Sequence, residues 1–319
     1  MKASRFALIA AGMIAAGEAP AQYPVRPVRV IIPITPGSGL DMVARLVSHK
    51  LSEGWGQPVI AENRPGAGTT LGTAAVAKSP ADGYTLLVNS AAHASNPAVY
   101  ATLPYDGLSD FVAVAPLARL VQVLVVAPSA GPKTVPELVA AAKARPGQLT
   151  FASAGTGGAV HFTGEKFKLA TGIDVVHVPY KGGPEAMNDV MMGRVTYWIP
   201  SIGTALPFIQ SGKMLALGVT SRERSAALPD VPTLAEMGVA GFEDSIWFGM
   251  WAPAGTPTGI VDALAKDISR ALAAPDLRQQ LAKLSAEPMS MTSAEFARFV
   301  RSEAESAARV ARAAGIKPQ

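Results

Sequence analysis

Short β-branched apolar runs alternate along the chain with small-residue turns and with segments that have the period of a helix. The run at 28–34 leads into the turn Pro36-Gly37-Ser38-Gly39, after which apolar residues recur from Leu40 to Leu51 on one helical face. The same order recurs after strands predicted at 59–61, 86–88, 149–152, 175–178 and 195–199. Strands that alternate with helices predict parallel sheets covered by helices on both faces.

The last part of the chain has a different pattern. Its spacing predicts helices at about 259–273, 275–284 and 293–314, and no strand-like run follows Trp251. We therefore expect this tail to pack as a helical layer on one domain.

The predicted turns also indicate where a ligand would bind. In an open α/β sheet, ligands bind beyond the carboxyl ends of the strands, where each strand turns into a helix. Glycine and serine let a ligand approach the backbone, and the helix that follows presents free N–H groups. Several such turns facing one cleft would hold an anion without an arginine. The alternative is that these glycines only make turns.

The N-terminus has the pattern of a secretory signal. Lys2 and Arg5 precede an apolar stretch at 6–17 and the small residues Ala19-Pro20-Ala21. We predict cleavage after Ala21, which leaves about 300 residues, a length typical of two domains. The alternative is an uncleaved membrane anchor. The protein is expected to be exported.

Composition excludes several classes of function. The chain has no cysteine, which excludes disulfides, thiolate catalysis and thiolate metal sites. The formal charge of +4 falls to +3 without the signal sequence, and no basic stripe suited to nucleic acid is present. The four histidines lack metal-ligand spacing, so no metal site is predicted. Met42 stands where a dinucleotide fingerprint after Gly37-Ser38-Gly39 needs a third glycine, so no cofactor is predicted either.

Most carboxylates near turns have structural explanations. Asp41 lies in the first turn of a predicted helix, where a carboxylate interacts favourably with the helix dipole. Three S/T-x-x-E patterns predict helix caps rather than general acids, at Thr134/Glu137, Thr233/Glu236 and Thr292/Glu295.

Serine and histidine near glycine turns leave two interpretations open. His161 opens a helix and could donate to an anion, or it could pack or cap. Ser153 is better explained as a ligand hydrogen bond than as a nucleophile, because no base is evident in the sequence. A secreted hydrolase using Ser153 or Ser90 with His161 or His93 would lack a G-x-S-x-G elbow. We therefore expect a protein that is not an enzyme.

Several stretches together resemble one family. They are "IPITPGSGLD", "ENRPGAGTTLGT", "DGYTLLVNS", "FASAGTGGAVH", "VPYKGGPEAMND", "GVTSRERSAALPDVPTLAEMG" and "FGMWAPAGTP". In this order they resemble the Bug-type substrate-binding receptors of tripartite tricarboxylate transporters. The resemblance implies an α/β, two-lobed periplasmic binding protein of type II with a ligand cleft between the lobes. Lobe 1 would comprise 22–122 plus 246–319, and lobe 2 would comprise 123–245.

The resemblance also implies a ligand, partners and a set of binding residues. The ligand would be a small organic carboxylate, and the partners would be the integral membrane permease subunits of a tripartite transporter or, alternatively, a periplasmic sensor. The protein would act as a periplasmic monomer. The implied ligand-binding residues are Thr35, Pro36, Gly37, Ser38, Gly39, Gly68, Thr69, Thr70, Ser90, His93, Ser153, Gly155, Thr156, His161, Tyr180 and Ser201.

The chain departs from the family pattern at several of these turns. Relatives commonly carry glycine where Ser38 and Thr69 stand, and a hydroxyl residue where Gly158 stands. Many relatives also have acidic or amide residues near the strand end that reads "TYWIPSIG" here, and Tyr197, Trp198 and Ser201 are expected to reshape this wall of the second lobe. These differences bear on which carboxylate is bound more than on the mode of binding.

Overall fold

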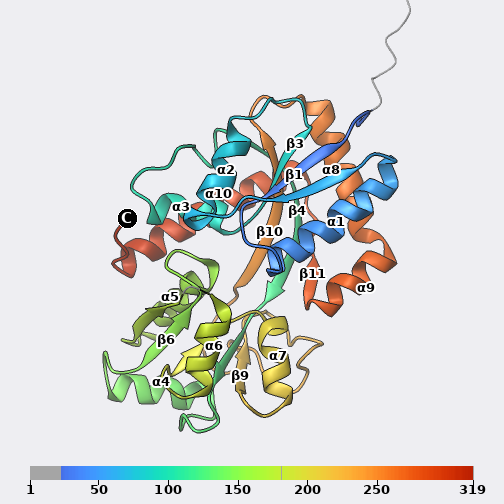
Figure 1. Cartoon of the computed structure of the whole chain (residues 1–319). Helices are drawn as coiled ribbons and strands as arrows, with labels where there is room; N and C mark the ends of the chain where they lie inside the picture. Colours follow the sequence, from blue (N-terminus) through green and yellow to red (C-terminus); the bar gives the residue numbers. More distant parts are fainter. Residues whose placement is uncertain (1–22, 181, 319) are drawn as a thin grey trace, which may run out of the picture.

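The computed structural model describes residues 23–180 and 182–318. The predicted signal sequence, residues 1–21, lies outside the described residues. Figure 1 shows two α/β lobes, one above the other, each with helices around its own sheet. Among the residues described, no helix is both long and apolar enough to cross a membrane.

The first lobe is built on a six-stranded sheet with the order β11-β4-β10-β3-β1-β2. Its strands are β1 (Val28–Ile32), β2 (Val59–Asn63), β3 (Thr85–Ser90), β4 (Phe111–Val121), β10 (Ser245–Pro253) and β11 (Ala286–Pro288). Its helices are α1 (Gly39–Trp55), the 3₁₀ helix η1 (Ala67–Thr69), α2 (Thr70–Ala77), α3 (Ala92–Val99), α8 (Thr258–Ala273), α9 (Pro275–Lys283) and α10 (Ser293–Ala313). One buried cluster packs α1, α8 and α9 on one face of the sheet, and another packs α2, α3 and α10 on the other.

The second lobe is built on a five-stranded sheet with the order β7-β6-β8-β5-β9. Its strands are β5 (Val123–Val126), β6 (Thr150–Ser153), β7 (Val176–Pro179), β8 (Tyr197–Trp198) and β9 (Leu215–Val219). Its helices are α4 (Val135–Ala144), α5 (Ala159–Thr171), α6 (Gly183–Met191) and α7 (Ile202–Gln210). Helices α4 and α5 cover one face, and α6 and α7 cover the other. Both sheets are therefore covered on both faces, as the alternating pattern predicts.

The sheets are mixed, which corrects the expectation of purely parallel sheets. Strand β1 pairs in parallel with β2 and β3, and β6 pairs in parallel with β7 and β8. In contrast, β10 runs antiparallel to β3 and β4, and β5 runs antiparallel to β8 and β9. The reason is the path of the chain: β4 leads into the second sheet through Gln122, and β10 returns in the opposite direction (Figure 1).

The C-terminal tail has the three predicted helices, but it is not purely helical. Strand β10 extends past Trp251 to Pro253, and the three residues of β11 pair antiparallel with β4. The expectation that no strand follows Trp251 was therefore wrong. A strand of three residues that ends in Pro288 is too short to produce a period-2 pattern.

Candidate functional site

The predicted site loops of the first lobe lie at one edge of its sheet. Because β1 pairs in parallel with β2 and β3, the loops that follow these three strands leave the sheet at the same end. Residues 35–39, 68–70 and 90–93 all belong to these loops or to the first turn of the next helix. The topology thus brings together the first-lobe residues that the sequence singled out.

The β1–α1 loop is closed by hydrogen bonds within its own sequence. Thr35, Pro36 and Gly37 are exposed, whereas Ser38 is half-buried and caps α1. The Asp41 N–H donates to Ser38 Oγ at 3.2 Å, and the Gly37 N–H donates to the Asp41 carboxylate at 2.9 Å. This geometry confirms the structural interpretation of Asp41. It also shows that Ser38 and Gly37 already have partners inside the loop.

Asp41 also joins this loop to the end of β2. Its carboxylate accepts hydrogen bonds from Asn63 Nδ2 at 2.8 Å and from Arg45 Nε at 3.0 Å. Burial opposes the charge on Asp41, but the hydrogen bonds from Gly37, Asn63 and Arg45 prevail and lower its pKa below 3.8. The loop is therefore anchored by a carboxylate that stays ionised near neutral pH.

The β2–α2 loop packs its side chains into the first lobe. Gly68 and Thr69 have positive φ angles of 58° and 80°, and Thr69 and Thr70 are buried. Asn96 Nδ2 donates to the Gly68 carbonyl at 3.1 Å and lies 3.2 Å from Thr69 Oγ1. A side chain at Gly68 would meet the Tyr100 hydroxyl, so glycine is required there on steric grounds.

The two predicted site residues of the β3–α3 loop, Ser90 and His93, lie in different surroundings. Ser90 pairs with Phe248 across the sheet, and its hydroxyl accepts the Ala92 N–H at 3.3 Å. His93 is 1% exposed, bonds the Gly107 carbonyl through Nε2 at 2.7 Å and packs on Trp251. Burial lowers the pKa of His93 to about 4, so its ring is neutral at pH 7. The structure thus places His93 in the core of the first lobe.

In the second lobe, Ser153 has a partner that the sequence did not suggest. Its hydroxyl lies 2.6 Å from His177 Nε2, accepts the Gly155 N–H at 3.2 Å and lies 3.0 Å from the Gly155 carbonyl oxygen. The hydrolase hypothesis paired Ser153 or Ser90 with His161 or His93. The pairing in the structure is Ser153 with His177, because Phe151 is in register with His177 and Ser153 lies one pleat further along the same face.

His161 is an acceptor for the backbone of the same loop. It is 3% exposed, and its Nδ1 accepts the Gly157 N–H at 3.1 Å. Its ring stacks on that of His177 with 3.9 Å between centroids. Burial and the charge of Lys168 lower the pKa of His161 to about 4. At neutral pH it is therefore an uncharged packing and capping residue, the structural alternative that the sequence left open.

The remaining predicted residues lie at the ends of the neighbouring strands. Thr156 is exposed at the tip of the β6–α5 loop, whereas Gly155, with φ of 123°, is half-buried. The Tyr180 hydroxyl donates to Asp189 at 2.7 Å, and burial together with this contact raises its pKa to about 12. Ser201 directly precedes α7, and its hydroxyl shares a hydrogen bond with that of Thr204.

Three of these loops converge where the chain crosses between the lobes. A side chain at Gly39 would lie 3.0 Å from Leu120, at the end of β4, and 3.8 Å from Phe248. Phe248 is also the strand partner of Ser90. Ser201 forms an isolated β-bridge with Gln122. The β1–α1, β3–α3 and β8–α7 loops therefore all lie beside the crossover.

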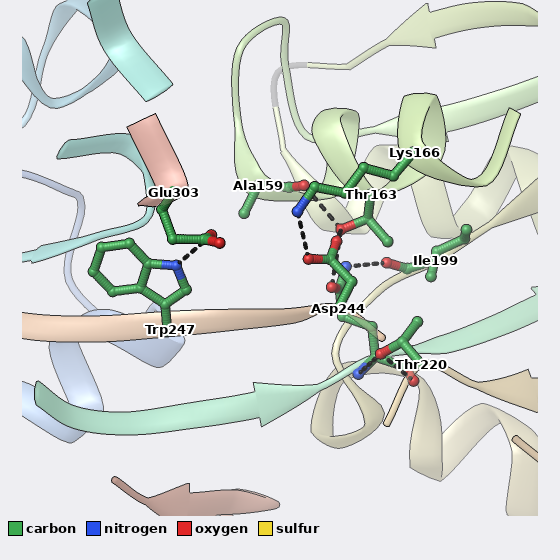
Figure 2. Close-up of polar contacts among 9 residues, drawn as sticks. Ala159, Thr163, Lys166, Ile199, Thr220, Asp244, Trp247 and Glu303 are labelled. Atoms are coloured by element: carbon green, nitrogen blue, oxygen red, sulfur yellow. Dashed lines mark hydrogen bonds and ion pairs between the residues drawn. The ribbon is translucent and has the colours of Figure 1, made fainter. Parts of the chain in front are cut away.

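Gln122 organises this crossover, and its partners Thr163, Ile199 and Thr220 are labelled in Figure 2. Its fully buried side chain donates to the Ile199 carbonyl at 2.8 Å, and its Oε1 lies 3.0 Å from the Thr163 hydroxyl oxygen. Its backbone N–H lies 3.1 Å from Thr220 Oγ1, and its carbonyl accepts the Thr220 N–H. Both polar ends of this buried side chain therefore lie within hydrogen-bond distance of a polar atom.

Asp244 holds helix α5 against the returning segment of the crossover. It accepts a hydrogen bond from Thr163 at 2.6 Å and forms an ion pair with Lys166 Nζ at 2.7 Å (Figure 2). Nearby, Glu303 of α10 accepts from Trp247 Nε1 at 3.0 Å. Burial opposes the charge on Lys166, but Asp244 and Glu303 outweigh it and raise the pKa of the ammonium. This cluster could not be predicted from the sequence, because its members are distant along the chain.

The lobes also touch on one side of the crossover. Ser95 of α3 donates to the Gly157 carbonyl at 3.4 Å, and Val99 packs against Phe162 of α5 and the end of α10. A cavity of about 30 Å³ lies among these helices, lined in part by Ala91, Ser95 and Lys166, and it has room for about one water. The β6–α5 loop of the second lobe thus faces the first lobe directly.

The fold around this crossover defines the class of the protein. Small-residue turns from two lobes lie around a crossover, and no group of three or more His, Cys, Asp or Glu among the described residues could hold a metal ion. Two α/β lobes joined by crossing strands define the class of two-lobed periplasmic binding proteins, which confirms the predicted fold.

Comparison with known proteins gives the family. The model of the tripartite tricarboxylate transporter family receptor matches residues 43–316, and the chain belongs to this family. Protein BugT of Bordetella pertussis is 37% identical over 311 residues, covering 97% of this chain and 95% of BugT.

Two solved structures of the same kind carry ligands. R. palustris Rpa4515 with adipate superposes with a TM-score of 0.83 at 36% identity, covering 93% of this chain and 100% of the other. MatC from Rhodopseudomonas palustris with bound malate has a TM-score of 0.78 at 33% identity, covering 91% of this chain and 100% of MatC. The family is one of periplasmic binding proteins, as the resemblance in sequence implies.

Proposed function

We propose that the protein captures a small organic dicarboxylate between its lobes and delivers it to the membrane permease of a tripartite transporter. The observation that carries this proposal is the likeness, over more than nine-tenths of the chain, to structures holding adipate and malate. The site supports the same chemistry, because several small-residue turns precede helix N-termini around one crossover.

The proposal includes the lobes, the location and the state of the protein. Lobe 1 comprises 22–122 plus 246–319 and lobe 2 comprises 123–245, a division supported by the membership of the two sheets. Cleavage after Ala21 releases a periplasmic monomer. Closure of the lobes on the ligand creates the form that the permease recognises.

The backbone N–H groups and hydroxyls of the turns bind the carboxylates. The exposed positions Thr35, Pro36, Gly37 and Thr156 and the half-buried Ser38, Gly39, Ser90, Tyr180 and Ser201 provide the contacts. A hydrolase gains no support, because Ser153 is fully buried and burial, His161 and Lys168 lower the pKa of its His177 partner to about 3. Such a histidine is a weak base at neutral pH.

Calorimetry and thermal unfolding with matched ligands test the proposal. Adipate and malate are compared with adipamide, which has the length of adipate but no charge. A dicarboxylate at 100 times its dissociation constant should stabilise the protein by about 2.7 kcal/mol, and adipamide should not. Binding of the diamide with no response to any dicarboxylate would contradict the proposal.

A pull-down from membrane extracts distinguishes the transporter from a sensor. The ligand-loaded protein should retain permease subunits, and the ligand-free protein should retain less of them. Retention of a sensor protein alone would favour the signalling alternative.

A further inference from the structure

The β6–α5 loop is held by the buried side chains of Ser153 and His161 and by the half-buried side chain of His177. Its glycines at 155 and 157 both have positive φ angles, 123° and 81°, so the loop has an unusual backbone path. The N–H groups of both glycines are bound by side chains, Gly155 by Ser153 and Gly157 by His161. Thr156, which is exposed, lies between these two anchored positions.

The contacts of Ser153 indicate the tautomer of His177. A hydroxyl has one proton and two lone pairs, and Ser153 Oγ has three close partners. They are the Gly155 N–H at 3.2 Å, the Gly155 carbonyl oxygen at 3.0 Å and His177 Nε2 at 2.6 Å. All three are satisfied when Ser153 donates to the carbonyl and accepts from the glycine and from His177. His177 then carries its proton on Nε2.

The contacts of His161 indicate its tautomer as well. Because the Gly157 N–H donates to Nδ1 at 3.1 Å, that nitrogen has no proton. The proton is then on Nε2, which lies 3.8 Å from Glu165 Oε1. Both imidazoles are neutral in this arrangement, and their rings stack at 3.9 Å between centroids.

We propose that His161, His177 and Ser153 are positioning residues. Ser153 and His161 bind the N–H groups of Gly155 and Gly157, His177 orients the Ser153 hydroxyl, and together they present the tip at Thr156 to the ligand. This inference rests on the proposed function, since it explains how one binding loop of that site is shaped. It differs from the expectation that Ser153 and His161 contact the ligand themselves.

Low pH should disrupt this arrangement by protonating His161. Protonation of His161 at Nδ1 removes the acceptor for Gly157 and places a cation against the ring of His177. The charged groups that face the pair are Glu165, which is nearest, and Lys168, both on α5. Burial is the largest cause that keeps both rings neutral, so the loop retains its shape until the pH falls well below the ordinary pKa of histidine.

Nitrogen-15 NMR of the ligand-free protein tests the tautomers without any binding assay. Histidine-labelled protein at pH 7 should show an unprotonated Nδ1 and a protonated Nε2 for both His161 and His177. His49, whose side chain is 73% exposed, serves as the internal reference for the labelled histidine signals. A proton on Nδ1 of His161 at pH 7 would overturn the inference.

Two variants separate positioning from packing. In His161→Asn the amide oxygen takes about the place of Nδ1 and still accepts from Gly157, whereas His161→Leu keeps the volume and removes the acceptor. Loss of one hydrogen bond predicts adipate or malate binding weaker by about 5- to 10-fold in His161→Leu, with His161→Asn within about 3-fold of wild type. The matched control is His49→Leu, which should bind as wild type does.

The pH profile completes the test and separates it from failure of the proposed function. The ratio of the dissociation constants of wild type and His161→Asn cancels protonation of the ligand. It should rise as the pH falls from 7 towards 3.5, through the pKa of His161 at about 4, because only wild type loses its acceptor. A constant ratio, or an equal loss of affinity in the Asn and Leu variants, would overturn the inference. If wild type binds no dicarboxylate, the proposed function fails, and the NMR test alone decides this inference.

Discussion

The β1–α1 loop of the first lobe and the β6–α5 loop of the second lobe have similar sequences but different supports. Each ends a strand, turns through glycines and begins a helix. The first is closed by Ser38 and Asp41, which lie within the loop and the next helical turn. The second is closed by His161 and by His177, which comes from the neighbouring strand. Each loop is therefore held by a side chain from its own helix and by one from a neighbouring strand, which is Asn63 of β2 in the first and His177 of β7 in the second. The two supports differ in charge: the first is built on an ionised carboxylate, and the second on neutral imidazoles.

The two loops should therefore respond differently to pH. A carboxylate on Asp41 accepts several hydrogen bonds and stays charged, so the first loop is rigid over a wide pH range. Neutral imidazoles hold the second loop only while the lobe excludes water from them. The β6–α5 loop also contacts the first lobe, because Ser95 donates to the Gly157 carbonyl. A change in the shape of this loop would therefore change the contact between the lobes.

The largest expected effect comes from acid, which should affect the two loops in different pH ranges. The pKa values of His161 and His177, about 4 and about 3 in the folded protein, lie below 6.5, so the unfolded chain binds more protons between these values. The stability they provide is complete above pH 6.5 and falls as the pH decreases towards 4. The pKa of Asp41 lies below 3.8, so its contribution falls only below that pH.

We expect the free energy of unfolding in urea to fall by roughly 3 kcal/mol or more between pH 7 and pH 4. Hydrogen exchange should show amides 155–158 opening in this range while amides 37–41 stay protected. His161→Asn should have a shallower pH dependence, and the control His49→Asn should keep the wild-type slope. Equal stability at pH 7 and pH 4 would contradict the difference between the loops.

A matched pair of glycines provides the next test. Gly37 and Gly157 have nearly the same φ, 82° and 81°, but a Cβ on Gly37 would meet nothing within 4 Å, whereas one on Gly157 would lie 2.8 Å from Val99. Positive φ costs both alanine variants about 1 kcal/mol, and the clash adds about 1–3 kcal/mol at Gly157 alone. Urea unfolding should therefore show the larger loss for Gly157→Ala. Equal losses would mean that the lobes do not press on the loop at Gly157.

The fold and the first loop could be predicted from the sequence because their signals are local. The helix of 39–55 and the cap formed by Ser38 and Asp41 depend on residues a few positions apart. Histidine 177 gave no such signal, because it meets Ser153 only through the register of two strands 24 residues apart. Gln122 and Asp244 both lie within hydrogen-bond distance of the Thr163 hydroxyl at the crossover, and no short-range pattern in a single sequence encodes these contacts.

The smallest expected effect separates the two possible roles of Ser38 in the first loop. As a cap alone, Ser38→Ala should lower the free energy of unfolding by about 1 kcal/mol, and Ser38→Asn should restore it because asparagine is an equally good cap. Dicarboxylate affinity measured on the same variants then reports on the ligand. If the Ser38 hydroxyl contacts the carboxylate, Ser38→Asn should bind more weakly than wild type despite its restored stability. If Ser38→Asn recovers both stability and affinity, Ser38 acts only through the helix. The two loops would then be alike in one respect: in each, the side chains hold the backbone, and the backbone binds the ligand.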